Sequence, residues 1–229
     1  MSNPQHYLFT EKYRPTTLEG YIGNPIFRTD LEKWIEDGQI PNIILSGIAG
    51  AGKTTAAKLI TENIDCDFIY INASDENGID TIREKVKSFA STASFKPLKI
   101  VILDEADYLT SAAQSALRNV IETFSLTTRF IFTCNYFERI SEPIKSRLER
   151  YELSAPTKKE LAIKCKEILE LEEVEYDIND IALLVNQTYP DNRQTLIKLQ
   201  SFSKSGKLII TSIQSQISKV SDSLIKALK

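Results

Sequence analysis

One ten-residue stretch constrains the fold of this chain more than any other part of its sequence. The stretch is "SGIAGAGKTT", at residues 46–55, and it has the spacing G-x-x-x-x-G-K-[ST]. It follows a short apolar run, Ile43 to Leu45, that reads as a buried strand, and it precedes apolar residues at helical spacing. Because strand, loop and helix occur together, the stretch predicts a phosphate-binding loop (P-loop). The alternative is a glycine-rich turn that binds nothing.

Each residue type in the P-loop suits a nucleotide for a physical reason. Glycines let the backbone curl so that its N–H groups face the phosphates, and the N-terminus of the following helix adds a dipole that favours anions. We expect Lys53 to meet the outer phosphates and the Thr54 hydroxyl to ligate Mg²⁺. The nucleotide contacts predicted in this loop are Gly47, Gly50, Ala51, Gly52, Lys53, Thr54 and Thr55.

Composition sets the remaining limits. A chain of 229 residues with 42% hydrophobic content can bury one good core, or a large domain and a small one. The net charge of −3 does not decide whether the chain binds DNA, because positive charge can gather on one face. Three widely spaced cysteines favour neither a disulfide framework nor a CxxC metal pair, and no apolar run approaches membrane-spanning length. We therefore expect an intracellular protein that is not secreted and has no membrane partner.

The chain alternates between predicted strands and helices up to about residue 153. Four further strand candidates are Phe68 to Ile71, Lys99 to Leu103, Arg129 to Cys134 and Arg150 to Leu153. Helical patterns at 79–89 and 111–124 separate them, which indicates an α/β domain with a five-stranded parallel sheet flanked by helices. Beyond "SAPTKKE" the helical patterns at 161–169, 178–185 and 195–199 have no strands between them. The predicted domains are thus residues 1–154 and an all-helical unit, 155–229.

A pair of acidic residues ends the strand in "KIVILDEAD". Asp104 is expected at the carboxyl edge of the sheet, where it can hold Mg²⁺, and Glu105 is placed to orient and deprotonate a water for attack on the γ-phosphate. Acidic residues after a strand can also be ordinary solvated loop residues. The P-loop about fifty residues upstream favours the catalytic interpretation.

Two more polar residues follow later strands. Asn135 ends "RFIFTCN" and would point into the same crevice to position the attacking water, although an Asn at a strand end can also be a turn former. Arg147 in "ERISEPIKSRLERYEL" suits charge stabilisation on a transferring phosphoryl group across a subunit boundary. A surface salt bridge is the alternative for Arg147.

Taken together, these motifs resemble those of a known protein family. The chain resembles the small ATP-hydrolysing subunit of a sliding-clamp loader (replication factor C), a family of AAA+ ATPases. The motifs that carry this resemblance are, in order, "EKYRP", the P-loop, "NASDENGID", "VILDEAD", "TTRFIFTCN" and "EPIKSRLER". "TYPDNRQTLIKLQ" is similar to the lid segment of these subunits, and its Tyr-Pro-Asp-x-Arg form looks closest to the clamp-loader ATPase of tailed bacteriophages. The resemblance covers roughly residues 9 to 203. It implies a P-loop AAA+ sheet domain followed by a small helical lid domain.

The resemblance also implies roles for individual residues. Lys53 and Thr54 match the Walker A motif, Asp104 and Glu105 match Walker B, and Asn135 matches the sensor 1 position. The remaining matches are the arginine finger Arg147, the sensor 2 arginine Arg193, the adenine-side segment Tyr13, Arg14 and Pro15, and the helix positions Gln114 and Arg118, which couple DNA contact to release of the catalytic glutamate.

The implied cofactors and partners follow. The cofactors are ATP and Mg²⁺, and the partners are other clamp-loader subunits in a ring or spiral, a sliding clamp and primer-template DNA. Arg83 and Lys87, four residues apart, are candidate contacts to DNA phosphates, with a solvated helix face as the alternative. Tyr108 and Leu109 resemble the clamp-contacting region, with packing under a loop as the alternative. The compartment would be the host cytoplasm for a viral protein or the nucleus for a eukaryotic one.

Some features depart from the family pattern. Leu148 replaces the cysteine that usually follows the Ser-Arg pair, and Ile48-Ala49 replaces a common Pro-Pro in the P-loop, but neither removes a charged group. We expect no helical collar domain, usual in such subunits, within these 229 residues, either because the sequence is a piece of a longer protein or because the natural protein lacks a collar. The apolar stripe Ile213, Ile217, Val220, Leu224 and Leu228 is expected to pack on the lid, with a partner contact as the alternative. Two rival interpretations are another AAA+ DNA-processing ATPase, a branch-migration or helicase-loading motor, and a structural subunit that only binds nucleotide.

Overall fold

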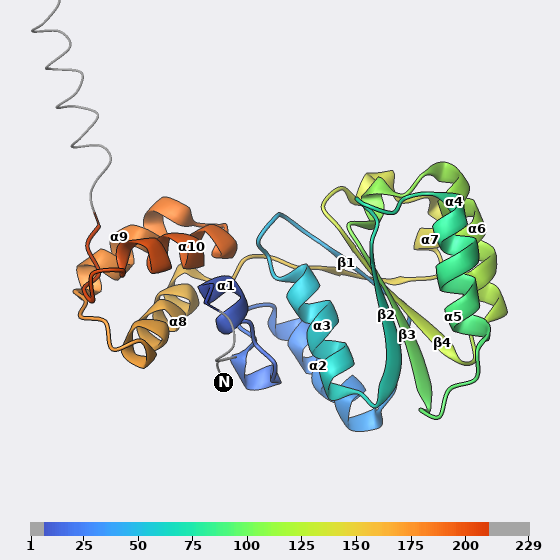
Figure 1. Cartoon of the computed structure of the whole chain (residues 1–229), viewed down its shortest axis with the longest axis horizontal. Helices are drawn as coiled ribbons and strands as arrows, with labels where there is room; N and C mark the ends of the chain where they lie inside the picture. The colour runs from blue at the N-terminus through green and yellow to red at the C-terminus, as the bar shows by residue number, and fades with distance from the viewer. Residues whose placement is uncertain (1–6, 211–229) are drawn as a thin grey trace, which may run out of the picture.

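A five-stranded parallel sheet forms the centre of the computed structural model, which describes residues 7–210 (Figure 1). The strand order is β2-β3-β4-β1-β5, and every neighbouring pair is parallel, with Ile43 of β1 beside Ile131 of β4 and Glu149 of β5. The predicted five-stranded sheet is therefore confirmed. The strands are β1 (Ile43–Ser46), β2 (Cys66–Asn72), β3 (Leu98–Asp104), β4 (Thr128–Cys134) and β5 (Glu149–Glu152).

Helices cover both faces of the sheet, which explains why its inner strands are almost wholly apolar. Helices α2 (Pro25–Asp37) and α3 (Lys53–Asn63) pack on one face, where Ile43 and Leu45 of β1 are buried. Helix α6 (Ser111–Thr123) packs on the other face, against Ile44. Successive residues of a strand point to opposite faces, so β1 contributes to both cores.

The segment predicted as one helix over residues 79–89 is instead built from three pieces. These are α4 (Ile79–Thr81), the π-helical turn η2 (Ile82–Val86) and α5 (Lys87–Ser91). Ile82 and Val86 of the π-turn are fully buried, because they pack against α6 and the sheet. The chain thus stays helical but is locally underwound beside Arg83.

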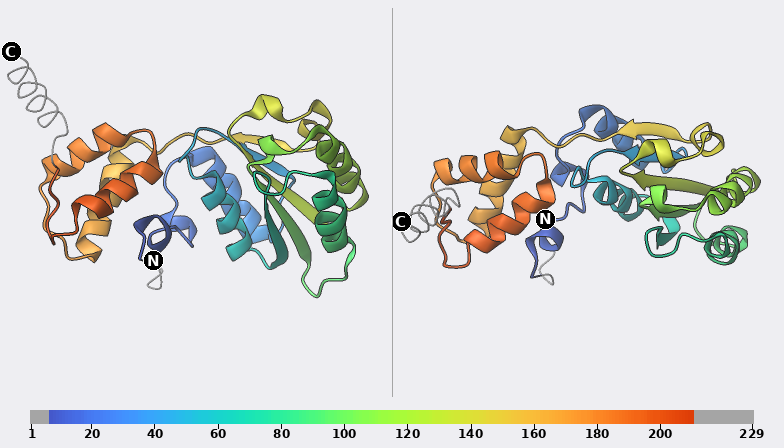
Figure 2. Two further views of the ribbon diagram at one scale, coloured as in Figure 1. Left: turned by 45° about the horizontal axis from the view of Figure 1, so that its top comes forward. Right: turned by 90° about the horizontal axis from the view of Figure 1, so that it is seen from above.

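Three helices form the lid at the C-terminal side of the sheet domain (Figure 2). They are α8 (Lys158–Leu171), α9 (Ile178–Thr188) and α10 (Asn192–Phe202), and α8 begins with a capping box in which Thr157 and Glu160 satisfy each other's backbone N–H groups. The short helix α1 (Phe9–Lys12) also packs in the lid core, because Phe9 and Tyr13 are buried against Leu161 and Leu169. The boundary near residue 155 remains a prediction, and the first described residues pack with the lid.

Shorter elements connect the larger ones. They are η1 (Leu18–Gly20), η3 (Ala106–Tyr108), η4 (Phe137–Arg139) and α7 (Glu142–Lys145). Within residues 7–210, no helix combines the length and apolar character that crossing a membrane needs. The apolar stripe predicted at 213–228 lies outside the described residues.

Candidate nucleotide-binding site

The P-loop connects the end of β1 to the start of α3, as its sequence predicted. Two of its glycines are required by close contacts. At Gly47 a Cβ atom would lie 2.2 Å from the Leu153 carbonyl oxygen, and at Gly50 it would lie 2.4 Å from Asp191 Oδ1 of the lid. Gly50 also has φ +78°, which an L side chain adopts only with strain. The loop is therefore held closely between β5 and the N-terminus of α10.

Lys53 is the most connected side chain of the loop. Its ammonium group donates hydrogen bonds at 2.8 Å to the carbonyl oxygens of Gly47 and Ile48 and to Asn135 Oδ1 at the end of β4. Burial lowers the pKa of Lys53, and the carboxylates of Asp104 and Glu105 oppose that shift. The structure thus brings the predicted Walker A lysine and sensor 1 asparagine together.

Asp104 at the end of β3 collects three hydroxyl donors. Thr54 Oγ1 lies 2.9 Å from Asp104 Oδ1 and 3.0 Å from Oδ2, the Tyr70 hydroxyl lies 2.5 Å from Oδ2, and Thr133 Oγ1 donates to Oδ1. The predicted metal ligands Thr54 and Asp104 are therefore adjacent. Among the described residues there is no cluster of three His, Cys, Asp or Glu side chains that could hold a metal ion. One carboxylate and one hydroxyl nevertheless fit Mg²⁺, which takes its other ligands from water and phosphate.

Two further acidic residues, Glu105 and Asp107, follow Asp104 and have different surroundings. Glu105 has φ +55°, in the left-handed region that is strained for a glutamate, and its backbone N–H donates to Thr133 Oγ1 at 3.0 Å. Asp107 is buried and accepts from the backbone N–H groups of Asn135 and Tyr136, both at 3.3 Å. Asp107 thus fixes the turn that carries Asn135. Sequence reasoning missed it, although it is the third acidic residue of "DEAD".

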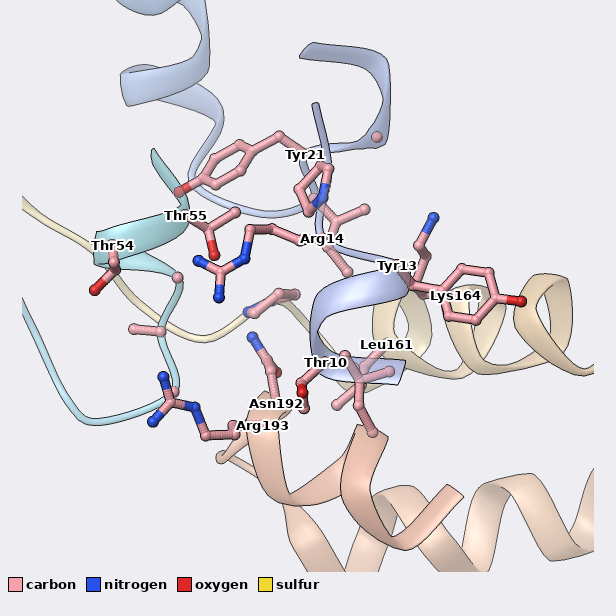
Figure 3. Close-up of a pocket in the computed structure, with 18 of the residues that line it drawn as sticks. Thr10, Tyr13, Arg14, Tyr21, Thr54, Thr55, Leu161, Lys164, Asn192 and Arg193 are labelled. Atoms are coloured by element: carbon pink, nitrogen blue, oxygen red, sulfur yellow. The ribbon is translucent and has the colours of Figure 1, made fainter. Parts of the chain in front are cut away.

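A pocket lies between the P-loop, the segment after α1 and the N-terminus of α10 (Figure 3). Its lining includes Gly50, Lys53 and Thr54 from the P-loop and Arg193 from the lid. In Figure 3 the guanidinium groups of Arg14 and Arg193 are both directed toward the P-loop. Positive charge from three parts of the chain therefore converges where phosphates would lie.

Unsatisfied polar atoms provide an independent test of whether a nucleotide fits this pocket. Among the described residues, four buried side-chain polar atoms have no hydrogen-bond partner, and three of them belong to residues that line the pocket. These three are Arg14 Nε, Tyr21 Oη and Asn192 Oδ1. Buried polar groups are nearly always satisfied in folded proteins, so the pocket suits a ligand that carries both donors and acceptors. A nucleotide base and ribose meet that requirement.

Tyr13 lies between the pocket and the lid core. Tyr13, Arg14 and Pro15 all line the pocket, and the Tyr13 ring is directed away from Arg14 and Arg193 (Figure 3). The ring is buried in the lid core with 6% of the residue exposed, and its hydroxyl donates to Glu172 at 2.5 Å. An aromatic ring gains more by joining an apolar core than by facing an open pocket. Its side chain therefore anchors the segment to the lid.

Arg147 lies outside this pocket. Its guanidinium group binds Glu122 of α6 and donates to the Pro143 carbonyl oxygen at 2.5 Å. Glu122 also lies 3.8 Å from Arg118, one helical turn away. The chain's own nucleotide pocket thus contains no arginine finger, and Arg147 is left on a separate surface.

Gln114 is buried between three segments. Its amide nitrogen donates to the carbonyl oxygens of Leu109 at 3.2 Å and Arg139 at 3.1 Å, and its oxygen accepts from the backbone N–H of Ser141 at 2.7 Å. Ser141 directly precedes α7, which leads to Arg147. The predicted coupling residue therefore connects the loop after β3 to the segment that carries Arg147.

The remaining predicted contacts lie on two other surfaces. Arg83 and Lys87 are exposed and line one groove between η2, α5 and α6, with Ser115 and Asn119 on its far side. Tyr108 is 47% exposed, whereas Leu109 is 5% exposed and packs in the core beneath α6. The burial of Leu109 favours packing under a loop, the alternative to a clamp contact at this residue.

Family models match both parts of the chain. Residues 43–155 match the ATPase family associated with various cellular activities (AAA), and residues 154–213 match the AAA+ ATPase lid domain of a sliding-clamp-loader large subunit. The structure also resembles the Thermotoga maritima RuvB Holliday junction branch migration motor, with a TM-score of 0.65 over 82% of this chain and 64% of that one. At 21% sequence identity, that likeness shows the fold alone.

Curated relatives give the family. The replication factor C small subunit of Sulfurisphaera tokodaii is 38% identical over 93% of this chain and 67% of the relative, and that of Archaeoglobus fulgidus is 39% identical over 88% and 66%. The probable replication factor C subunit 2 of Dictyostelium discoideum is 38% identical over 84% and 60%. The chain thus spans about two thirds or less of these relatives' lengths. They are archaeal and eukaryotic, so they do not support the predicted bacteriophage likeness. The chain belongs to the replication factor C small subunit family of AAA ATPases.

Proposed function

We propose that this chain is the ATPase subunit of a sliding-clamp loader, which uses ATP to open a clamp and place it on primer-template DNA during DNA replication. One observation carries the proposal. Lys53 donates a hydrogen bond to Asn135, and its neighbour Thr54 donates one to Asp104, beside a pocket that is also lined by Arg193 of a clamp-loader-type lid. The relatives' name, replication factor C small subunit, points to DNA replication as the process.

Each residue of the site has a chemical task in this proposal. Lys53 neutralises charge on the outer phosphates, and Thr54 and Asp104 would hold Mg²⁺, which withdraws electron density from the phosphates when bound. Glu105 takes the proton from the attacking water. Asn135 orients that water, and its own position is fixed by Lys53 and Asp107. Arg193 responds to the phosphates by holding the lid on the P-loop.

The proposed partners follow from surfaces outside this pocket. Arg147 completes the site of a neighbouring subunit, which fits its distance from its own P-loop network. The groove that contains Arg83 and Lys87 follows the phosphates of primer-template DNA without reading its sequence. Tyr108 remains the candidate contact to the clamp.

The compartment is part of the proposal. Cys66, Cys134 and Cys165 are free and buried, which accords with an intracellular, reducing setting. A bacteriophage origin rests only on the Tyr-Pro-Asp-x-Arg segment at residues 189–193.

A clamp-loading assay tests this function. The chain, purified with its partner subunits, is mixed with labelled clamp, circular primed DNA and ATP, and clamp retained on the DNA is counted. We expect retention to require ATP and to fall to background with Lys53→Ala. Glu105→Gln should bind ATP yet fail to release closed clamps. ATP-independent retention would contradict the proposal.

A further inference from the structure

The N-terminal segment forms one wall of the nucleotide pocket but is carried by the lid. Helix α1 packs beside α10, and the Phe9 and Tyr13 rings meet edge to face with centroids 5.3 Å apart inside the lid core. Directly after Tyr13, Arg14 and Pro15 line the pocket. Two pocket walls, one before β1 and one after β5, therefore belong to the same packed unit.

Hydrogen bonds attach this segment to the lid at two places. At its start, Gln200 of α10 accepts from the Phe9 N–H at 3.1 Å and donates to the Tyr7 carbonyl oxygen at 2.7 Å. At its end, Glu172 at the C-terminus of α8 accepts from Lys12 Nζ at 2.6 Å and from the Tyr13 hydroxyl at 2.5 Å. The second attachment lies one residue before Arg14.

The surroundings of Glu172 make its attachment strong. The side chains of Lys12 and Glu172 are only 25% and 23% exposed, so water screens their attraction less than it would on an open surface. Burial alone would raise the pKa of Glu172, but the hydrogen bonds from Lys12 and Tyr13 outweigh it and hold that pKa below its ordinary value. Burial and the nearby carboxylate raise the pKa of Tyr13, so the hydroxyl remains a donor. Hydrogen bonds to an ionised group are about twice as strong as neutral ones.

We propose that Glu172 is a positioning residue for nucleotide binding, which ties the wall containing Arg14 to the lid that carries Arg193. With this tie, both arginines approach the P-loop together when the lid closes. Without it, Arg14 must be ordered separately, and the entropy of that ordering weakens binding. This inference rests on the proposed function of the pocket as an ATP site.

The chain offers a matched control on the same helix. Glu170 also accepts from a tyrosine hydroxyl, that of Tyr176 at 2.9 Å, and lies 3.6 Å from Lys166. Neither of these partners belongs to the N-terminal segment or lines the pocket. Glu170→Ala therefore removes the same kinds of contact without freeing Arg14.

The first measurement is the dissociation constant of ATP by titration calorimetry, with the Tyr13 and Glu172 side chains varied singly and together. We expect Glu172→Ala and Tyr13→Phe each to weaken binding, Glu172→Ala by about tenfold, with no further loss in the double variant. Glu172→Gln keeps an acceptor for Tyr13 and should recover part of the affinity. Glu170→Ala should bind as the wild type does.

A second readout needs no nucleotide. Backbone hydrogen exchange at Lys12 and Tyr13, whose N–H groups bond to Leu8 and Phe9, should accelerate in Glu172→Ala and stay slow in Glu170→Ala. Equal ATP affinity in Glu172→Ala and the wild type, or equal weakening by Glu170→Ala, would overturn the inference. A wild-type chain that binds no ATP would instead overturn the proposed function, and the exchange experiment would still test the tie.

Discussion

The Lys53 ammonium lies 2.8 Å from Asn135 Oδ1, which joins the P-loop to the carboxyl end of β4. Strand β1, which precedes the P-loop, and strand β4 are neighbours in the sheet, although Lys53 and Asn135 are 82 residues apart in the sequence. The bond places a group that meets phosphate beside a group suited to orient water. Asp107 holds the backbone of Asn135 by accepting a hydrogen bond from its N–H at 3.3 Å.

Asn135→Ala should therefore lower kcat more than ATP affinity. Loss of the amide leaves Lys53 with its two carbonyl partners but removes the group that orients water, so we expect kcat to fall about 100-fold. Steady-state hydrolysis and calorimetric ATP binding separate the two effects. A large loss of affinity with unchanged kcat would show that Asn135 serves binding instead.

Asp104→Asn should change the Mg²⁺ requirement. The substitution keeps the size of the side chain but removes the charge beside Thr54, so we expect the Mg²⁺ concentration for half-maximal hydrolysis to rise about 100-fold. Tyr70→Phe is the matched control, because it removes a hydroxyl donor to Asp104 and leaves the carboxylate in place. Mg²⁺ titrations of hydrolysis compare the variants, and an unchanged requirement in Asp104→Asn would exclude it as a ligand.

Glu122→Gln should separate stability from activity. Glu122 is exposed and pairs with Arg147 and Arg118 on the surface, where ion pairs contribute little to stability. We expect an unchanged melting temperature and, in assembled subunits, faster hydrolysis because Arg147 is freer to reach a neighbour. Hydrolysis that falls in Glu122→Gln as far as in Arg147→Ala would mean that the pair must stay intact.

The buried thiols predict a pH dependence. Burial raises the pKa of Cys66 to about 11 and that of Cys134 and Cys165 to about 12, from an ordinary value of 9.0. Thiolates therefore form more readily in the unfolded chain, and the contribution of the thiols to stability is fully present below pH 9.0 and is lost as the pH rises toward 11 or 12. Iodoacetamide at pH 8 should spare all three thiols in the native chain and alkylate all three in urea. Rapid native alkylation would contradict their burial.

Local patterns were enough to predict the sheet and the P-loop network. The strands are short apolar runs that end at polar residues, so their carboxyl ends had to bring Asp104 and Asn135 to the same edge as Lys53. Parallel strands buried on both faces leave few alternatives for such runs. Asp107 was missed because an acidic residue in a loop has no pattern that marks it as buried.

Long-range packing was the part that the sequence could not reveal. Tyr13 and Glu172 are 159 residues apart, and nothing local shows that the first helix joins the lid core. Leu109 is similar, because an apolar residue after the Walker B acids fits either an exposed contact or the core. In both cases tertiary burial decided between two locally equivalent positions.

Steady-state ATP hydrolysis by the chain with its partner subunits, with and without primer-template DNA and clamp, tests the central proposal most directly. We predict strong stimulation by primed DNA and clamp together, abolished by Arg147→Ala although that variant still binds ATP at its own Lys53 site. Hydrolysis that is indifferent to both DNA and clamp, or that survives Arg147→Ala, would contradict a clamp loader with sites shared between subunits.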